Sequence, residues 1–347
     1  MHTAVTNSIR TRPPAAFAFV MATGIVSVGL HLEGLSGPST ALLWIAGAGF
    51  TILLVALAVR ARIAPHAAAA DLRDPARAFG YFTLVAGANV LGVRLEIAGA
   101  VLPGAILLAL ATLAWILLGY LIPWRVVEQA DGADLTDTVD GSWFVWVVAS
   151  QSVSVLAATL QPHARGTPRD ILALLAVLSW GTGLGLYLVT GTALVVRVLR
   201  HGISAEHLGP AFWVVMGALA ISTLAASRLL TMAPSSIGDA IHALAAGVGL
   251  TLWAFAAWLV LPLAAMGWWR HVRRRVPLTY NAGLWAMVFP LGMVSVASMA
   301  LGGADGVPAS AAVGRVFLWV AVTAWLVVAL AGVVAGLRAV RAARMAA

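Results

Sequence analysis

The chain has 347 residues, 61% of them hydrophobic and 10% charged, with a formal net charge of +8. Roughly a quarter of the residues of an ordinary soluble domain are charged, so this composition excludes a soluble globular protein and indicates a membrane protein. All 21 basic residues are arginine and cysteine is absent, which excludes disulfides, thiolate metal sites and a cysteine nucleophile. The positive charge needs no nucleic-acid partner, because arginines flanking membrane spans set topology and attract anionic headgroups.

Apolar runs long enough to cross a bilayer, about 20 residues each, occur ten times. In chain order they are Pro14–Leu32, Ser39–Val59, Ala78–Leu95, Val101–Ile122, Trp143–Leu160, Ile171–Leu199, Pro210–Met232, Ala240–Met266, Gly283–Leu301 and Ala311–Leu337. The connections are short. The sequence therefore predicts an all-α integral membrane protein with one transmembrane domain, residues 1–347, and short terminal segments at 1–13 and 338–347.

The arginines predict how the spans are oriented. With the N-terminus inside, 16 of the 21 arginines fall on the inner side and 5 on the outer side. Positively charged flanks resist translocation and collect on the cytoplasmic side. We therefore expect both termini to be cytoplasmic.

A hydrophobic segment of similar texture recurs five times, at intervals of 63 to 73 residues. The copies are FVMATGIVS ending at Ser27, FTLVAGANV at Val90, WVVASQSVS at Ser154, VVMGALAIS at Ser222 and MVFPLGMVS at Ser295. This period fits one helical hairpin per repeat. The repeat predicts ten transmembrane helices in five hairpins with a quasi-fivefold arrangement, in which the odd-numbered helices line a central pore.

Polar and small residues in the middle of the odd spans are the candidates for lining this pore. Helices packed ~10 Å apart in a ring of five, each with a radius of ~5 Å, leave a bore about 7 Å wide, which passes a small, largely dehydrated ion. An alternative is that the hydroxyls bond their own or a neighbouring helix and the glycines serve helix packing. The predicted pore-lining residues are Met21, Gly24, Ser27, Leu84, Gly87, Asn89, Val148, Gln151, Ser154, Met216, Ser222, Gly292 and Ser295.

The ninth span departs from the other repeats at one column. Where they carry Met21, Leu84, Val148 and Met216, it carries Phe289, followed by Pro290. Proline removes a backbone donor and clashes with the preceding turn, so a kink or break is expected there. Phe289 is the candidate gate of the bore. The alternative is an aromatic side chain that only fills the core of the bundle.

Ionisable residues are missing from the span centres. No carboxylate lies near the middle of a span, which weakens both a carrier that depends on a buried acid and an intramembrane hydrolase. His242, about one turn into the eighth span, is either a titratable site or a hydrogen-bonded packing residue. The acidic residues from Glu128 to Asp140 lack the ligand pattern of a calcium loop and predict a solvated loop that pairs with arginines. We expect no enzyme activity, cofactor or metal site.

The segments RPPAAFAFVMATGIVSVGL and LWAMVFPLGMVS, together with the plan of ten spans, resemble the tellurite-resistance/dicarboxylate transporter family. This family includes bacterial TehA, plant guard-cell slow anion channels and fungal malate and sulfite transporters. The resemblance implies a bacterial inner-membrane homotrimer in which each protomer holds a pore lined by odd helices and blocked by Phe289. The partners it implies are the lipid bilayer and small inorganic or organic anions.

Two functions are compatible with this resemblance. The first is a small-anion channel or transporter with Phe289 as its gate. The second is a secondary carrier or exporter for a C4-dicarboxylate such as malate, or for an oxyanion such as sulfite or tellurite. Five similar hairpins differ from the two inverted halves of many rocking carriers, which favours the first.

Overall fold

The computed structural model describes residues 12–130, 134–206, 208–304 and 306–345, and this part of the chain contains helices and no strand. Of the terminal segments predicted from the sequence, residues 1–11 and 346–347 lie outside it. In the described residues, ten helical spans are long and apolar enough to cross a membrane, and each overlaps one of the ten predicted spans, most of them extending a few residues further. The prediction of an all-α membrane protein with ten spans is confirmed.

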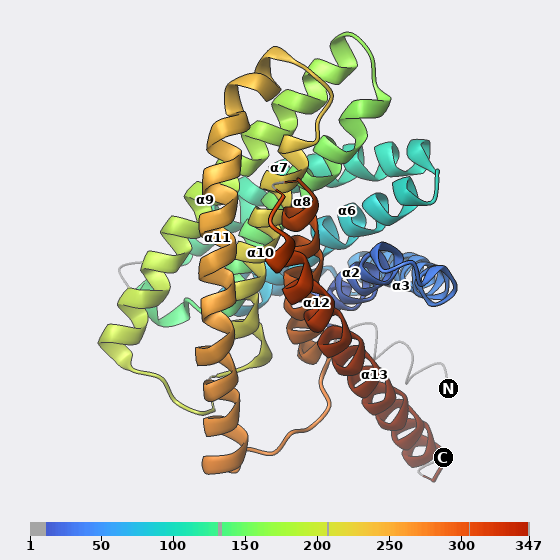
Figure 1. Cartoon of the computed structure of the whole chain (residues 1–347). Coiled ribbons are helices and arrows are strands. Elements are labelled where there is room, and N and C mark those ends of the chain that lie inside the picture. The colour runs from blue at the N-terminus through green and yellow to red at the C-terminus, as the bar shows by residue number, and fades with distance from the viewer. Residues whose placement is uncertain (1–11, 131–133, 207, 305, 346–347) are drawn as a thin grey trace.

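The spans form five consecutive hairpins, each of an inner helix followed by an outer helix packed against it (Figure 1). The inner helices are α2 (Ala18–Leu32), α6 (Phe82–Ile97), α8 (Phe144–Leu160), α10 (Trp213–Leu230) and α12 (Trp285–Ala304). The outer helices are α3 (Ser36–Ile63), α7 (Val101–Ala130), α9 (Thr167–His201), α11 (Ser236–Trp268) and α13 (Pro308–Met345).

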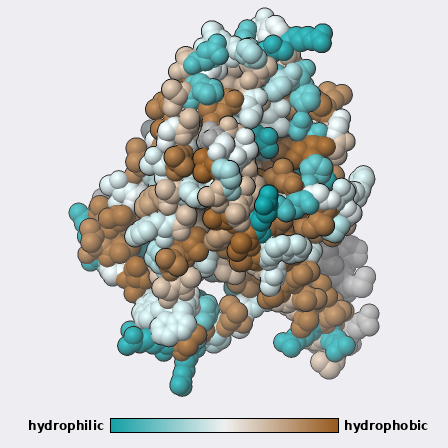
Figure 2. Space-filling model, in the orientation of Figure 1, coloured by the Kyte–Doolittle hydropathy of each residue, from teal (hydrophilic) through white to brown (hydrophobic). Residues whose placement is uncertain are grey.

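Burial separates the two sets of helices. The inner spans are 72–89% buried and the outer spans 17–28%. Large apolar side chains such as Trp44, Leu188 and Leu330 are exposed on the outer helices, and Figure 2 shows apolar side chains over α9 and α13 on the flanks of the molecule. Such faces are stable against lipid, so the odd spans form the interior and the even spans surround them.

The inner helices contact one another in a closed order. Helix α2 packs against α6, α6 against α8, α8 against α10, α10 against α12, and α12 against α2 again. Each inner helix is preceded by a 3₁₀ turn, and these turns contact one another in the same cyclic order. The turns are η1 (Pro14–Phe17), η2 (Phe79–Tyr81), η4 (Gly141–Trp143), η6 (Pro210–Phe212) and η8 (Ala282–Leu284). The quasi-fivefold symmetry of the hairpins stays a prediction.

The connection after α3 contains two further helices, α4 (Pro65–Arg73) and α5 (Pro75–Ala78), which the hydropathy pattern did not predict. Asp71 on α4 is buried between two arginines. It pairs with Arg60 of α3 at 2.5 Å and with Arg77 of α5 at 2.6 Å. This cluster fixes the connection against the ends of two spans.

Candidate functional site

A narrow cavity lies at the centre of the inner helices, and its volume is about 20 Å³. All five inner helices contribute to its wall, each from its middle and the part that follows toward the C-terminal end. The lining residues are Ile25, Val28, Asn89, Val90, Val93, Ser152, Val155, Ile221, Leu224, Arg228, Met293 and Val296. The wall is apolar apart from one amide, one hydroxyl and one guanidinium, so it offers few ligands and no carboxylate.

Asn89 is the one predicted pore residue that lines this cavity. Its Nδ2 donates to Ser152 Oγ at 2.9 Å, and the Ser152 hydroxyl donates to the carbonyl of Ala149 at 2.7 Å. The Ser152 hydroxyl gives its one proton to Ala149 and can only accept from Asn89. The amide of Asn89 must therefore turn its Nδ2, and not its Oδ1, toward Ser152. Asn89 Oδ1 is left buried with no hydrogen-bond partner in the described part of the chain.

On the side of the cavity toward the N-terminal ends of the inner helices, the centre of the bundle is filled by apolar side chains. Phe289 lies one helical turn before Met293, and residues four apart share a face of a helix. Met21 and Val148 have the same relation to the cavity residues Ile25 and Ser152. Phe289 is 1% exposed, Met21 3% and Val148 0%. Three inner helices therefore place buried apolar side chains on the cavity-facing side, one turn nearer the N-terminal ends of these helices.

The predicted serine column lies elsewhere. Three of its hydroxyls donate to main-chain carbonyls of the outer helix in the same hairpin: Ser27 to Ser39 at 2.6 Å, Ser154 to Ala176 at 2.8 Å and Ser295 to Gly314 at 2.8 Å. The fourth, Ser222, donates to the carbonyl of Ala218 in its own helix. These bonds correspond to the packing alternative that the sequence left open for the hydroxyls.

The predicted glycines lie where inner helices approach closely. A Cβ added at Gly24 would stand 2.8 Å from Val90 Cγ1, and one at Gly292 would stand 2.8 Å from Ile25 Cγ2. A Cβ at Gly87 would meet η1 and α2 at 3.5 Å. Small residues at these positions bring the helices together.

Three further predicted residues contact other parts of the bundle. Gln151 Nε2 donates to the carbonyl of Trp180 on α9 at 3.2 Å. Leu84 is partly exposed and packs in a smaller apolar cluster with residues of α3. Met216 is fully buried in the main apolar core. None of the three belongs to the lining of the central cavity.

Pro290 does not break α12, which is continuous from Trp285 to Ala304. The predicted break is therefore wrong, and a kink stays a prediction. The proline lies in the second turn, and its ring occupies the space beside Gly217 of α10, where an added Cβ would stand 2.8 Å from Pro290 Cγ. This contact positions the start of α12, and with it Phe289, against the neighbouring inner helix.

Tryptophans of the outer helices form a set of contacts that the sequence did not predict. In four hairpins the indole N–H of the outer helix donates to the inner helix of the following hairpin, and α13 reaches back to α2. The bonds run from Trp115 to Ser150, from Trp180 to the carbonyl of Ser222, from Trp253 to Ser298 and from Trp325 to Thr23, over 2.8–3.2 Å. The sequence signal was a tryptophan in each of four even spans, at intervals of 65 to 73 residues.

Several charged groups outside the cavity are paired or hydrogen-bonded. Arg94 is buried and donates to the hydroxyls of Ser27 and Ser39 over 2.9–3.1 Å. In the acidic loop, Asp134 pairs with Arg200 at 3.2 Å, as predicted. The Thr136 hydroxyl and backbone N–H, followed by Arg200, hold the pKa of Asp134 below its usual value. The described residues contain no cluster of three His, Asp or Glu side chains that could hold a metal.

Comparison with known proteins identifies the family. A family model described as voltage-dependent anion channel, SLAC1, matches residues 12–333. The chain belongs to the SLAC1 family. This is the tellurite-resistance/dicarboxylate transporter family that the sequence resembles, and its members are transporters and channels. The SLAC1-family chain described here is accordingly a multi-pass membrane protein of an anion-transporting family.

Its relatives are similar to different extents. An uncharacterized membrane protein of Mycobacterium tuberculosis is 40% identical over 142 residues, which are 41% of this chain and 72% of that protein. An uncharacterized transporter of Methanocaldococcus jannaschii is 22% identical over 284 residues, 80% of this chain and 81% of the relative. A sulfite efflux pump of Trichophyton rubrum is 24% identical over 225 residues, 60% of this chain and 56% of the pump.

Proposed function

We propose that this protein is a small-anion channel or transporter of the bacterial inner membrane, with one pore through the centre of each protomer. The observation that carries this proposal is the central cavity, to which all five inner helices contribute lining residues. A cavity shared by every inner helix lies on the common axis of the bundle. The family match, which covers residues 12–333, supports anions as the transported class.

Phe289 is the gate in this proposal. It is fully buried, it has the largest side chain of its repeat column, and it lies one turn beyond the cavity residue Met293 on the same helix face. A hydrophobic constriction excludes water and so blocks a hydrated ion. Displacement of this ring would join the cavity to the opposite side of the bundle.

Anion preference has two general sources in the proposal. With both termini cytoplasmic, the positive N-terminal ends of the five inner helices face the cytoplasm, where they attract anions. Exposed arginines near that side, such as Arg62, Arg73 and Arg273, raise the local anion concentration. The sparse polar groups of the cavity bind weakly enough for the ion to leave again.

The assembly proposed is a homotrimer with an independent pore in each protomer. The exposed apolar faces of the outer helices are suited to lipid and to neighbouring copies alike. Mixing wild-type and gate-opened chains in one membrane tests the independence of the pores. Currents should then scale linearly with the fraction of opened chains.

Replacement of Phe289 by alanine tests the proposal. Purified protein in planar bilayers, with chloride, nitrate, sulfite or malate on one side, should carry large anion-selective currents in Phe289→Ala and small ones in wild type. Phe144→Ala is the matched control, because Phe144 is equally buried on an inner helix but its ring packs on Tyr187 of α9. Wild-type currents in a folded, membrane-inserted Phe289→Ala would refute the gate.

A secondary carrier or exporter for an oxyanion or a C4-dicarboxylate is the second candidate. It is favoured by the similarity to proteins named a transporter and a sulfite efflux pump. Saturable uptake of radiolabelled sulfite or malate into vesicles, with no single-channel events in wild type or Phe289→Ala, would identify a carrier.

A further inference from the structure

Arg228 connects two hollows of the molecule. It lines the central cavity and also a larger open hollow of about 640 Å³ at the C-terminal ends of three inner helices. This outer hollow is walled by residues of α2, α10, α12 and the start of α13, among them Thr231 and Arg315. In the described part of the chain, Arg228 is the residue common to both hollows. Its guanidinium therefore stands at the boundary that an ion must cross between them.

The guanidinium of Arg228 has unused bonding capacity. Its Nε is buried without a hydrogen-bond partner, and no described carboxylate lies within ion-pair distance of it. The charge of Glu96 acts on Arg228 from farther away, but Glu96 is held by His163 at 2.8 Å. The hydroxyl of Ser227, which also lines the outer hollow, is likewise buried and without a partner. Two adjacent residues thus carry unsatisfied donors.

The direction of the inner helices explains what the positive charge of Arg228 can do at this position. All five run in the same direction past the cavity, and α2, α10 and α12 end at the outer hollow, so negative dipole ends lie at this mouth. Those partial charges repel anions and attract cations. An arginine at this level opposes those partial charges and makes the mouth more favourable for anions. Cations at membrane depth are costly, and most of those retained serve a ligand or an ion pathway.

We propose that Arg228, with the hydroxyl of Ser227, forms an anion-binding site at the outer mouth of the pore, and that the site prefers small oxyanions. The inference deepens the proposed function and rests on it for the role of the site in transport. The planar edge formed by Nε–H and Nη–H matches two oxygens of one anion, whereas a spherical halide uses only its charge. Nitrate and sulfite are therefore the probes, and chloride is the reference.

Binding is measured first, without any requirement for conduction. The melting temperature of the purified protein is followed against nitrate, sulfite and chloride at constant ionic strength, because a ligand stabilises the state that binds it. Sulfite and nitrate should stabilise wild type more than chloride does. Arg228→Gln should lose this stabilisation. Arg228→Lys should keep a weak anion effect and lose the preference for oxyanions.

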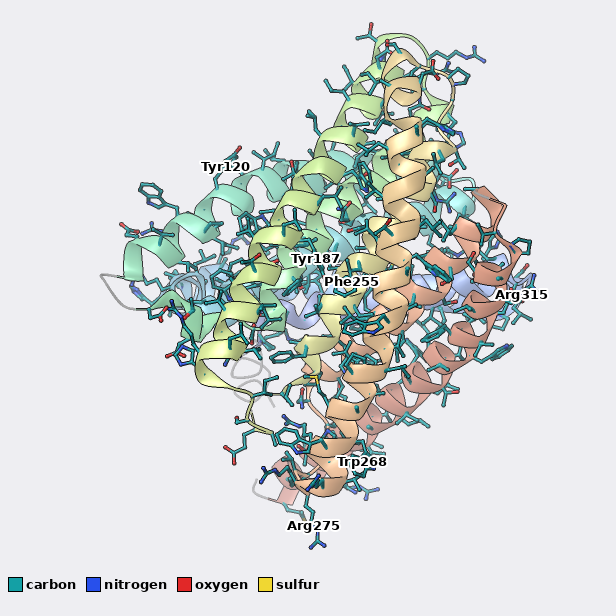
Figure 3. All side chains as sticks on the ribbon, turned by 60° about the vertical axis from the view of Figure 1, so that its left-hand side comes forward. Tyr120, Tyr187, Phe255, Trp268, Arg275 and Arg315 are labelled. Carbon is teal, nitrogen blue, oxygen red and sulfur yellow. The ribbon has the colours of Figure 1, made fainter. Side chains whose placement is uncertain are left out.

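Arg315→Gln is the matched control. Arg315 lines the same outer hollow, but it is paired with Glu33 at 3.2 Å and its side chain is 63% exposed. Figure 3 shows it at the periphery of the bundle. Its replacement should leave the oxyanion preference within about twofold of wild type, as expected for an exposed pair. Equal loss in Arg315→Gln and Arg228→Gln would show a diffuse charge effect and overturn the site.

Currents then separate this inference from the proposed function. In the Phe289→Ala background, Arg228→Gln should lower the anion-to-cation permeability ratio by at least about fivefold, since a charge at the mouth sets local ion concentration. Unchanged oxyanion stabilisation in Arg228→Gln would overturn the site even if Phe289→Ala conducts. Absent current in Phe289→Ala, with stabilisation that depends on Arg228, would refute the gated channel and retain the site. If Arg228→Gln does not fold, the same measurement is made on Arg228→Lys. An oxyanion preference as large as that of wild type in Arg228→Lys overturns the inference.

Discussion

The contact between Gly217 and Pro290 predicts a large effect from the addition of a single methyl group. A Cβ at Gly217 would stand 2.8 Å from Pro290 Cγ, 3.0 Å from its Cβ and 3.3 Å from its Cα. Ordinary carbon contacts begin near 3.5 Å, and neither a proline ring nor a backbone atom can rotate away. Overpacking of this kind costs ~1–3 kcal/mol, while replacing a helical glycine by alanine returns at most ~1 kcal/mol. Because the gain applies to any helical glycine, Gly217→Ala should be less stable than a helical Gly→Ala variant without this clash by ~1–3 kcal/mol.

Gly247→Ala is the control for this prediction. Gly247 lies within the outer helix α11, and among the described residues no atom apart from its chain neighbours and its own helix backbone lies within 4 Å of an added Cβ, so its substitution should be neutral or stabilising. Thermal unfolding of the two variants in the same detergent gives the difference directly. Because the methyl group pushes the start of α12, Gly217→Ala should also change flux through the protein. Equal stability of Gly217→Ala and Gly247→Ala would refute the close packing of α10 on α12, and with it our account of how Phe289 is positioned.

Two further predictions concern the contacts that hold the bundle together. Asp71→Asn removes the carboxylate between Arg60 and Arg77 and should lower the free energy of unfolding by ~3–5 kcal/mol. Its control is Glu128→Gln, at the exposed pair with Arg125, which should lower it by less than ~1 kcal/mol in the same unfolding assay. Trp325→Phe and Thr23→Val should show a coupling energy of about 0.6 kcal/mol in a double-mutant cycle, and a value of zero would argue against the bond between α13 and α2.

The number of spans and the division into inner and outer helices could be predicted from the sequence, because both follow from composition. A bilayer requires long apolar runs, and the polar residues in the middle of the odd spans mark helices that avoid lipid. The periodic recurrence of those spans identified which residues are equivalent. It could not identify which side of each helix faces the centre. Equivalent residues recur at the same position of each repeat whether they face the centre, a neighbouring helix or lipid.

The serine column illustrates this limit. Ser27, Ser154 and Ser295 recur because each hydroxyl bonds the outer helix of its own hairpin, and such a bond repeats with the same regularity as a pore contact. The residues that line the cavity are mostly valine, leucine and isoleucine, which a sequence does not distinguish from packing residues. Arg228 was visible as an arginine near the end of a span, but only its place between two hollows gives it significance.

The absence of a break at Pro290 and the helices after α3 have different explanations. Proline disrupts a helix through the carbonyl one turn earlier, and Pro290 stands so near the start of α12 that only the first turn is affected. Helix α4 is short and polar, so no hydropathy pattern reveals it, and its stability depends on the buried Asp71.

The absence of native cysteine permits the most direct test of where the pore runs. In the conducting Phe289→Ala background, single cysteines at Val155 and Val296, in the cavity, are compared with cysteines at Ser154 and Ser295, in the serine column, during application of a small anionic methanethiosulfonate. We predict that modification of Val155→Cys and Val296→Cys reduces the current, while Ser154→Cys and Ser295→Cys remain unmodified. Modification of the serine-column positions with no effect at the cavity positions would contradict a pore through the centre of the inner helices.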